Sequence, residues 1–335
     1  MPSSGGEDSS ASDVTPGRML AAWLAGGEAP VPHPVGRIND TWMVADSHVL
    51  QRLNGRVFIR PQAVMRNLSR VLAHDDTLLL APVPTRNGAP FAMDERGDLW
   101  RLFPRRKARD FESLPPSLFA AAAEAYGGFL ARFATFPHRL EPVIDGFHEL
   151  ERYLAALDEA PAGAAQERRA VDELRHAFEA PRRDRVIHGD CKVNNLLFHP
   201  ARDEVVAIID LDTVMLGDPA WDFGDLVRSA FAGTEESETV PALSAPGLAA
   251  LAGGFARGMG TLDEVARFSS GPAYMSLMLG VRFLVDHLSD DVYFKVSAHG
   301  DNLRRARGQL GLAQVFLDAR PMLTAALDRA LRGSA

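Results

Sequence analysis

The sequence contains a single cysteine, Cys191, among its 335 residues. One cysteine excludes an internal disulfide and agrees with a reducing compartment. No apolar run approaches the roughly 18 residues that a membrane-spanning helix needs. The stretch before M-L-A-A-W-L-A-G is acidic, which does not fit the basic start of a signal peptide. We therefore expect a cytoplasmic protein that has no membrane partner.

Positively charged residues are fewer than negatively charged ones. The chain has 36 Lys and Arg residues and 44 Asp and Glu residues, which gives a net charge of −8. A protein whose main partner is nucleic acid needs a basic face, so we expect no such partner. The motifs G-x-x-x-x-G-K-[ST], G-x-G-x-x-G and G-x-S-x-G are absent. Their absence leaves P-loop, dinucleotide-binding and α/β-hydrolase interpretations without support.

What the sequence does contain is a set of polar residues at the spacing of a kinase catalytic loop. Asp190 lies in H-G-D-C-K-V-N-N-L-L-F, Asn195 follows five residues later, and Asp210 ends the apolar run V-V-A-I-I-D. The segments N-N-L-L-F and V-V-A-I-I-D predict two arms of a hairpin, which would place Asn195 beside Asp210. Phosphoryl transfer from ATP needs a carboxylate that orients the attacking hydroxyl, and oxygen ligands for Mg²⁺. The spacing therefore predicts Asp190 as the catalytic residue and Asn195 and Asp210 as metal ligands.

Two residues close to Asp190, His188 and Cys191, could take part in other chemistry. We expect His188 to bond to the backbone and brace the loop, rather than to transfer protons. Cys191 invites a nucleophile hypothesis, but the loop already has a complete kinase interpretation. We therefore expect Cys191 to fill space in the loop.

The remaining pattern predicts an α+β chain with a bilobal, protein-kinase-like fold, in which a small β-rich N-lobe precedes a larger, mainly helical C-lobe. Residues 1–17, rich in Ser, Gly and Asp, predict a disordered tail. Residues 18–103 form the expected nucleotide-binding lobe, 104–116 a proline-punctuated connector, and 117–335 the C-lobe. Within the first lobe we expect a short helix at 18–25, a hairpin at 36–53, a helix at 61–73, and β-structure at 77–85 and 98–104. Later helices are expected at 117–136, 147–157, 163–179, 272–288 and 301–331.

These motifs resemble those of the aminoglycoside phosphotransferase and choline kinase superfamily. Its signature, H-G-D…N-x-L-x…I-D-x-x…G-D-P-x-x-D, stands here as H-G-D-C-K-V-N-N-L-L-F, I-I-D-L-D and G-D-P-A-W-D-F-G-D. The resemblance implies a kinase-like fold, with ATP and Mg²⁺ as cofactors, Asp190 as catalytic base, and Asn195 and Asp210 on the metal. It also implies that Asp218 and Asp222 brace the loop.

A closer resemblance, to the N-acetylhexosamine 1-kinase branch, extends from about Gly36 to Leu310. It is carried by G-R-I-N-D-T-W-M-V, I-D-L-D-T-V-M, W-D-F-G-D and G-V-R-F-L-V-D-H-L-S-D-D-V-Y-F-K-V. It implies phosphorylation of the anomeric hydroxyl of N-acetylglucosamine or N-acetylgalactosamine, and it places Arg282 and Tyr293 at the sugar. Both side chains can donate hydrogen bonds to sugar hydroxyls. The alternative is that Arg282 pairs with Asp286, one helical turn later.

The loop from Gly36 occupies the place of a glycine-rich phosphate loop, and Asn39, Asp40 and Thr41 offer donors to the phosphates of ATP. We expect the nucleotide near Leu102 and Phe103.

The strand that usually carries a kinase lysine offers Gln51 and Arg52 instead, and no acidic residue occurs at 53–73, so the usual Lys–Glu pair is absent. Strand alternation points Gln51 and Arg52 to opposite faces. We expect Arg52 to contact the phosphates, because its charge is fixed.

Two other functions stay open. The N-acetylhexosamine branch commonly has H-N-D where this chain has H-G-D, which leaves the acceptor open. An aminoglycoside or amino alcohol would need an acidic pocket, for which the candidates are Glu235, Glu236, Glu238, Asp290 and Asp291. A nucleotide-binding module without catalysis fits the missing Lys–Glu pair but not the intact catalytic set. The sequence leaves the oligomeric state open.

Overall fold

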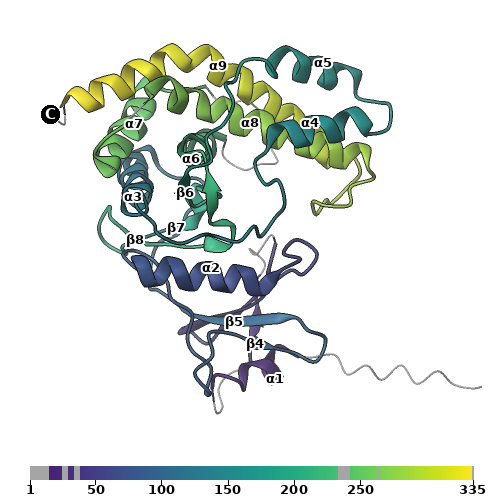
Figure 1. The fold of residues 1–335 in the computed structure, drawn as a ribbon, viewed down its shortest axis with the longest axis vertical. Helices are drawn as coiled ribbons and strands as arrows, with labels where there is room; N and C mark the ends of the chain where they lie inside the picture. Colours follow the sequence, from purple (N-terminus) through teal and green to yellow (C-terminus); the bar gives the residue numbers. More distant parts are fainter. Residues whose placement is uncertain (1–14, 25–28, 34–37, 233–241, 263, 334–335) are drawn as a thin grey trace, which may run out of the picture. The chain divides into compact units, whose positions relative to one another are not determined.

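The computed structural model describes residues 15–24, 29–33, 38–232, 242–262 and 264–333 (Figure 1). Their backbone forms two compact units. The smaller consists of the described residues up to Gln62 together with Ala81–Arg105. The larger consists of Ala63–Leu80 and the described residues from Arg106 onward.

The smaller unit is built on an antiparallel sheet with the strand order β1-β2-β3-β5-β4. The strands are β1 Val31–Pro32, β2 Asp40–Val44, β3 His48–Arg52, β4 Ala92–Met93 and β5 Leu99–Pro104. The predicted hairpin is confirmed, since β2 pairs with β3 around a turn in which Ala45 has a φ of 48°. The predicted β-structure at 77–85 is wrong apart from a bridge at Leu79, because Pro82 and Pro84 have no N–H to donate.

One face of this sheet holds a hydrophobic cluster. Trp42, Leu50 and Leu102 are cross-strand neighbours there, and Trp42 stacks on Trp100 at 5.2 Å. Helix α1, Pro16–Leu20, packs against this face through Met19 and Leu20. The helix begins inside the segment predicted to be disordered, because the Thr15 side chain caps it and a proline occupies its first turn. The rest of that predicted tail, residues 1–14, lies outside the described residues.

Helix α2, Pro61–His74, has the predicted bounds to within one residue. Its buried face includes Val64, Leu68 and Val71. Asn67 anchors the helix to the larger unit, because its amide exchanges two hydrogen bonds with the backbone of Glu141. From Ala63 onward the helix therefore belongs to the larger unit, whereas the sequence placed residues 18–103 together.

The larger unit is mainly helical and contains α3 Phe119–Arg132, α4 Leu150–Glu159, α5 Ala165–Leu174, α6 Pro219–Ala232, α7 Ala245–Met259, α8 Val265–Leu288 and α9 Asp301–Gly333. In Figure 1, α8 runs beside α9, and α3 beside α7. The predicted helices are present with shifted ends. Helix α4 starts three residues later than expected because His148 adopts a left-handed φ of 63°. Helix α8 begins at Val265 and contains Pro272 in its interior, where we had expected its start.

Helices α6 and α8 meet with almost no side chain between them. A Cβ atom at Gly224 would lie 2.3 Å from the carbonyl oxygen of Gly271, so glycine is required for this approach.

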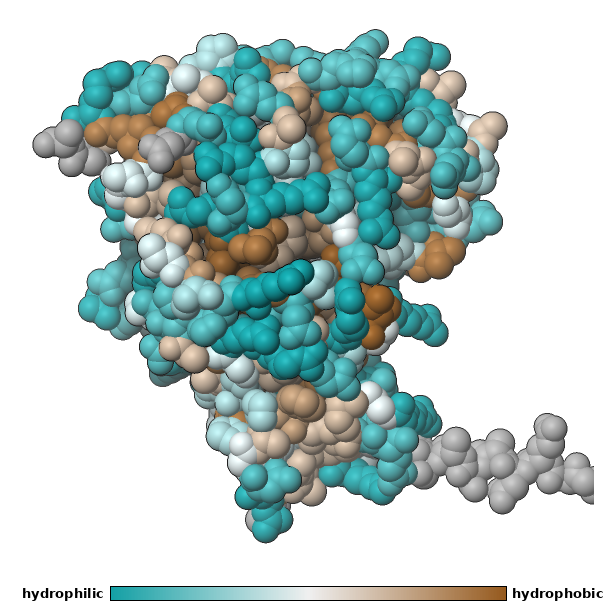
Figure 2. Space-filling view, viewed as in Figure 1, coloured by the Kyte–Doolittle hydropathy of each residue, from teal (hydrophilic) through white to brown (hydrophobic). Residues whose placement is uncertain are grey.

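Figure 2 shows that the visible face is mostly hydrophilic, with apolar side chains in scattered patches. Among the described helices, none has both the length and the apolar character that crossing a membrane requires.

Candidate active site

The catalytic candidates lie in loops and turns beside two small antiparallel strand pairs of the larger unit. Strand β6, Arg185–Ile187, pairs with β9, Met215–Gly217. Strand β7, Leu196–Phe198, pairs with β8, Val205–Ile208, which confirms the predicted hairpin. Short 3-10 turns, Val193–Asn195 and Leu211–Thr213, flank the second pairing.

The loop after β6 requires glycine at its centre. Gly189 has a φ of +81°, and a Cβ atom there would lie 2.6 Å from the carbonyl oxygen of Thr213. The Thr213 hydroxyl also donates to the carbonyl oxygen of His188, which fixes this approach. An asparagine tolerates positive φ, but its Cβ would meet the same carbonyl. The packing of this loop therefore explains why the chain has H-G-D.

His188 braces the loop through both ring nitrogens, as predicted. Its Nδ1 accepts from the backbone N–H of Asp190 at 3.2 Å, so Nε2 carries the proton and donates to the Ile209 carbonyl at 3.0 Å. The ring is fully buried, and burial lowers its pKa. A neutral imidazole with two occupied nitrogens cannot also serve as the catalytic base.

Asp222, on α6, holds the same loop from the other side. Its two oxygens accept from the backbone N–H groups of His188 at 2.7 Å and Gly189 at 2.9 Å. The resemblance assigned it this bracing role. The side chain is 1% exposed, and burial raises its pKa to about 7, although the backbone donors act in the opposite direction.

Asp190 is held by two donors from its own loop. The Asn195 side-chain amide donates to its carboxylate at 2.9 Å and to its main-chain oxygen at 2.8 Å. Lys192 Nζ lies 3.0 Å from the other carboxylate oxygen. Sequence analysis did not single out Lys192, although its position two residues after Asp190 was a usable signal. The carboxylate is therefore oriented, and a cation stands beside it.

Asn195 and Asp210 are neighbours across the β7–β8 hairpin. The N–H of Ile209 donates to the Asn195 carbonyl at 2.9 Å, and Asp210 is the next residue. Asp210 is exposed and has a left-handed φ of 62°. Because Asn195 gives its amide nitrogen to Asp190, its Oδ1 is the side-chain atom left to face a cation. An amide and a carboxylate oxygen fit the ligand preference of Mg²⁺.

His148 belongs to the loop's support and was missed by sequence analysis. Its Nε2 donates to the Gly189 carbonyl at 2.6 Å, and its own carbonyl accepts from the Tyr274 hydroxyl at 2.9 Å. Burial lowers its pKa to about 3, so the ring is neutral at physiological pH. No sequence pattern marks it, because its partners are more than 40 residues away along the chain.

Arg282, on α8, sits among four aromatic rings. Its guanidinium carbon lies 5.3 to 5.5 Å from their centroids, and the rings belong to Phe147, Tyr153, Tyr293 and Phe294. We call this group the Arg282 cage. Tyr293, the other predicted sugar contact, is part of it and is 47% exposed. Since Phe147 precedes His148, the cage adjoins the support of the catalytic loop.

The alternative partner of Arg282, Asp286, is engaged elsewhere. Its oxygens accept from the backbone N–H groups of Tyr293 at 2.7 Å and Phe294 at 2.9 Å, and from the Asn302 amide at 2.8 Å. No carboxylate of the described chain lies within ion-pair distance of Arg282. The helix-turn pairing that the sequence allowed is therefore not formed.

Arg52 lies on the sheet face that carries the hydrophobic cluster. Its guanidinium pairs with Asp40 at 2.6 Å and Asp98 at 3.5 Å, and it lies over the ring of Trp100. Asn39 is buried and accepts from the backbone N–H of Asn54 at 3.1 Å. These predicted phosphate contacts thus have structural partners, and Gly36, the start of the predicted loop, lies outside the described residues.

The opposite sheet face carries a different polar row. Thr41, Gln51 and Arg101 are cross-strand neighbours on β2, β3 and β5. Gln51 accepts from Arg101 at 2.9 and 3.1 Å, and the Arg101 guanidinium lies over Phe103. Leu102, another predicted nucleotide contact, has a fully buried side chain, and its carbonyl oxygen accepts from the backbone N–H of Val83 at 2.7 Å. Sequence analysis missed Arg101, whose charge is buried in an otherwise apolar strand.

Solved structures share this fold across most of the chain. A GDP complex of aminoglycoside 2'-phosphotransferase-IIIa covers 88% of this chain and 96% of its own, with 14% identity and a TM-score of 0.63. A choline/ethanolamine kinase family protein from Mesorhizobium loti covers 90% and 93%, with 16% identity and a TM-score of 0.53. Amicoumacin kinase, solved in complex with AMP-PNP, Ca²⁺ and Ami, covers 88% and 91%, with 14% identity and a TM-score of 0.58. The predicted kinase-like α+β fold is confirmed.

Similarity in sequence was found to one curated protein over a short stretch and to a family over most of the chain. A curated mouse protein, acyl-CoA dehydrogenase family member 10, is 43% identical over 54 residues, which span 16% of this chain and 5% of that protein. Over a much longer stretch, residues 20–263 match the family described as the phosphotransferase enzyme family. The chain belongs to this phosphotransferase family.

Proposed function

We propose that this chain is an ATP-dependent kinase for a small neutral polyhydroxylated acceptor, with the anomeric hydroxyl of N-acetylglucosamine or N-acetylgalactosamine as its target. The observation that carries the proposal is the Asp190 carboxylate, which is held by Asn195 and Lys192 on a braced loop. An oriented carboxylate beside a cation suits a reaction in which positioning and charge stabilisation supply most of the catalysis.

In this proposal Asp190 accepts a hydrogen bond from the acceptor hydroxyl and aims its oxygen at the phosphorus atom. Lys192 offers positive charge to the transferring group. Asn195 Oδ1 and Asp210 would hold Mg²⁺, which neutralises phosphate charge when it is bound. His188, His148 and Asp222 keep the loop in position, because each bonds to its backbone.

We propose ATP as the donor, in keeping with the GDP and AMP-PNP bound in structures of the structural relatives. Within the smaller unit we favour the row of Thr41, Gln51 and Arg101 for nucleotide binding, because Arg52 is already paired with two carboxylates. The segment at Leu102 and the ring of Phe103 remain part of the proposed nucleotide site.

The Arg282 cage supports a neutral acceptor. A guanidinium without a carboxylate partner in the described chain repels a cationic aminoglycoside or choline, but donates to hydroxyl and acetamido oxygens. Aromatic rings around it provide apolar surface for a sugar face. The structural relatives include an aminoglycoside phosphotransferase and a choline/ethanolamine kinase family protein, so an aminoglycoside or amino-alcohol acceptor is the alternative. Of the acids proposed for such a pocket, Asp291 is engaged by Asn302, and Glu235, Glu236 and Glu238 lie outside the described residues.

The first test measures ATP consumption with Mg²⁺ against N-acetylglucosamine, N-acetylgalactosamine, glucose, kanamycin and choline. The proposal expects turnover on the acetylated sugars and a product phosphate that is labile to acid but stable to alkali. Turnover on kanamycin or choline alone would reject the proposed acceptor and leave the phosphotransferase assignment standing.

The role of Asp190 is tested in the same assay. We expect Asp190→Asn to lose about two orders of magnitude or more in kcat, a typical size for a positioned acid–base group, while it folds normally. Asp203→Asn is the control, because that carboxylate lies in the turn of the β7–β8 hairpin and is 63% exposed. Near-normal turnover by Asp190→Asn would remove the residue from the mechanism.

A further inference from the structure

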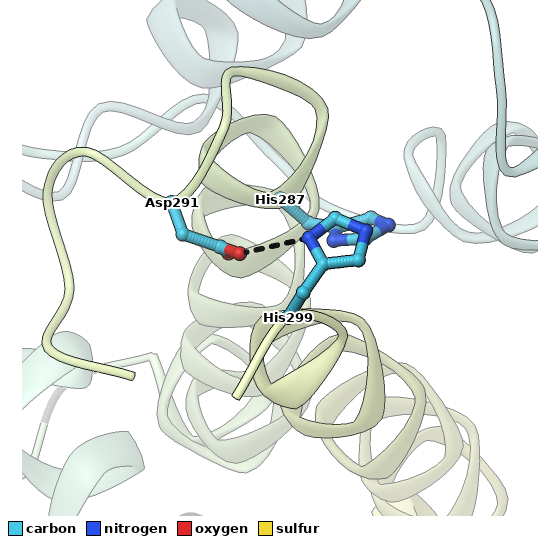
Figure 3. A group of neighbouring side chains, drawn as sticks. All are labelled: His287, Asp291 and His299. Carbon is cyan, nitrogen blue, oxygen red and sulfur yellow. Dashed lines mark ion pairs between the residues drawn. The ribbon is translucent and has the colours of Figure 1, made fainter. Parts of the chain in front are cut away.

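Three side chains that the proposed reaction does not use converge where α8 ends and α9 begins. His287 lies in the last turn of α8, Asp291 follows in the connecting segment, and His299 precedes α9. Each offers one ligand atom, and these atoms all lie within 4.8 Å of one another. Figure 3 shows the Asp291 carboxylate pointing toward the His299 ring, and the His287 ring lies beside that ring, with 5.2 Å between the two ring centroids.

The spacing within this group already approaches that of a coordinated ion. His299 Nδ1 lies 3.4 Å from Asp291 Oδ2. Two ligands of a tetrahedral Zn²⁺ ion, at bond lengths near 2.0–2.1 Å, are about 3.3 Å apart. The other ligand atoms lie within 4.8 Å, and the His299 side chain can turn to shorten its distance to His287 because it is 78% exposed.

The other two ligands are positioned by the fold. Asp291 is 8% exposed, its second oxygen accepts from the Asn302 amide at 2.8 Å, and its backbone N–H donates to Asp286. Such a hydrogen bond orients a metal-bound carboxylate. His287 has a buried Nδ1 with no hydrogen-bond partner in the described chain. A buried nitrogen without a partner is costly unless something binds it.

We propose that His287, Asp291 and His299 form a binding site for a divalent transition-metal ion of the Zn²⁺ type, with water as the fourth ligand. Two imidazoles and one carboxylate suit Zn²⁺ and its neighbours, whereas Mg²⁺ prefers oxygen ligands throughout. The site is therefore chemically distinct from the oxygen ligands Asn195 and Asp210.

An ion at this site would tie together both ends of the segment 289–300. That segment carries Tyr293 and Phe294, which are two rings of the Arg282 cage. Metal binding therefore orders the cage, and this consequence for the acceptor, unlike the metal site itself, rests on the proposed function.

The test titrates the tag-free full-length chain with Zn²⁺ in excess Mg²⁺, using competition with a chromophoric chelator. The wild-type chain is expected to bind one equivalent more tightly than His299→Gln or Asp291→Asn, by about tenfold or more. His176→Gln is the matched control, because it removes an exposed histidine of the larger unit that lies outside the cluster. His299→Gln changes an exposed side chain, so misfolding does not confuse the comparison.

Hydrogen exchange supplies the second measurement. Zn²⁺ is expected to slow exchange of backbone amides in 289–300 in the wild-type chain and in His176→Gln, and to leave His299→Gln unchanged. Equal Zn²⁺ affinity in wild type and His299→Gln, or no slowing in the wild type, would overturn the site. Neither measurement uses ATP or an acceptor, so failure of the metal site and failure of the kinase proposal are distinguishable.

Discussion

Asp222 is a buried side chain that holds the catalytic loop, and replacing it by asparagine removes its charge while keeping nearly the same shape. In the wild-type chain, burial raises the pKa of this carboxyl from its ordinary 3.8 to about 7. That rise corresponds to about 4 kcal/mol of free energy, at about 1.4 kcal/mol for each pKa unit. Asparagine has nearly the same shape but does not titrate. Its amide also leaves one of the two backbone N–H donors at His188 and Gly189 without an acceptor.

The sign of the pH effect follows from proton binding. Between pH 3.8 and about 7, the folded protein keeps the Asp222 proton that the unfolded chain has released. The folded state then binds more protons, so the contribution of Asp222 to the free energy of unfolding is largest in acid and is lost as the pH rises through about 7. Between pH 5 and pH 8, the stability of wild type relative to Asp222→Asn should therefore fall by about 3 kcal/mol.

The assay is urea denaturation of both proteins at several pH values between 5 and 8, followed by far-UV circular dichroism. This signal reports chiefly on the larger unit, which contains most of the helices. Asp203→Asn, which removes an exposed carboxylate, is the control for general charge effects. A stability difference between wild type and Asp222→Asn that stays constant with pH would refute the reasoning.

Three further predictions concern packing, nucleotide binding and catalysis. Gly224→Ala should lower the free energy of unfolding by about 1–3 kcal/mol, because its Cβ would meet the backbone of α8. Gly253→Ala has only a flexible side chain nearby and should raise the free energy of unfolding by about 0.5–1 kcal/mol. Urea denaturation compares the two variants, and equal effects would contradict the packing argument. Arg101→Gln should raise KM for ATP about tenfold and Arg52→Gln should leave it nearly unchanged, and the reverse order in steady-state kinetics would return the phosphate contact to Arg52. Lys192→Met should lower kcat about 10²-fold with little change in KM for the acceptor, and unaltered kcat would show that its position beside Asp190 has no catalytic effect.

The sequence predicted which candidate residues lie close together where that proximity depends on local pattern. Asn195 and Asp210 close the two arms of an alternating hairpin, so the register of β7 and β8 alone brings them together. Asp190 is fixed by its own neighbours, since its donors Asn195 and Lys192 lie within five residues. Contacts between residues this close in sequence can be predicted without knowledge of the tertiary fold.

The supports of the loop were harder to predict because their partners are distant. His148 reaches the loop from 41 residues away, and it does so from a left-handed backbone conformation that no residue pattern marked. In the smaller unit, the contacts of the polar side chains on each face of the sheet were equally hard to predict, because they depend on how distant strands pair. Fixed charge favoured Arg52, but the pairing of β3 with β5 places Asp98 beside Arg52 and Arg101 beside Gln51.

In the Arg282 cage, one part of the arrangement could be predicted from the sequence and another part could not. Its cation was visible in the sequence as a charge inside an apolar helix, and pairing with Asp286 one turn later was the simplest expectation. The structure gives Asp286 three other donors, including the backbone N–H groups of Tyr293 and Phe294. The same carboxylate therefore places two of the rings that surround Arg282 and is itself kept from neutralising it. A half-buried charge that is surrounded by rings but has no carboxylate within ion-pair distance among the described residues is available to a ligand. That arrangement is the physical reason to expect an acceptor that offers oxygen atoms rather than positive charge.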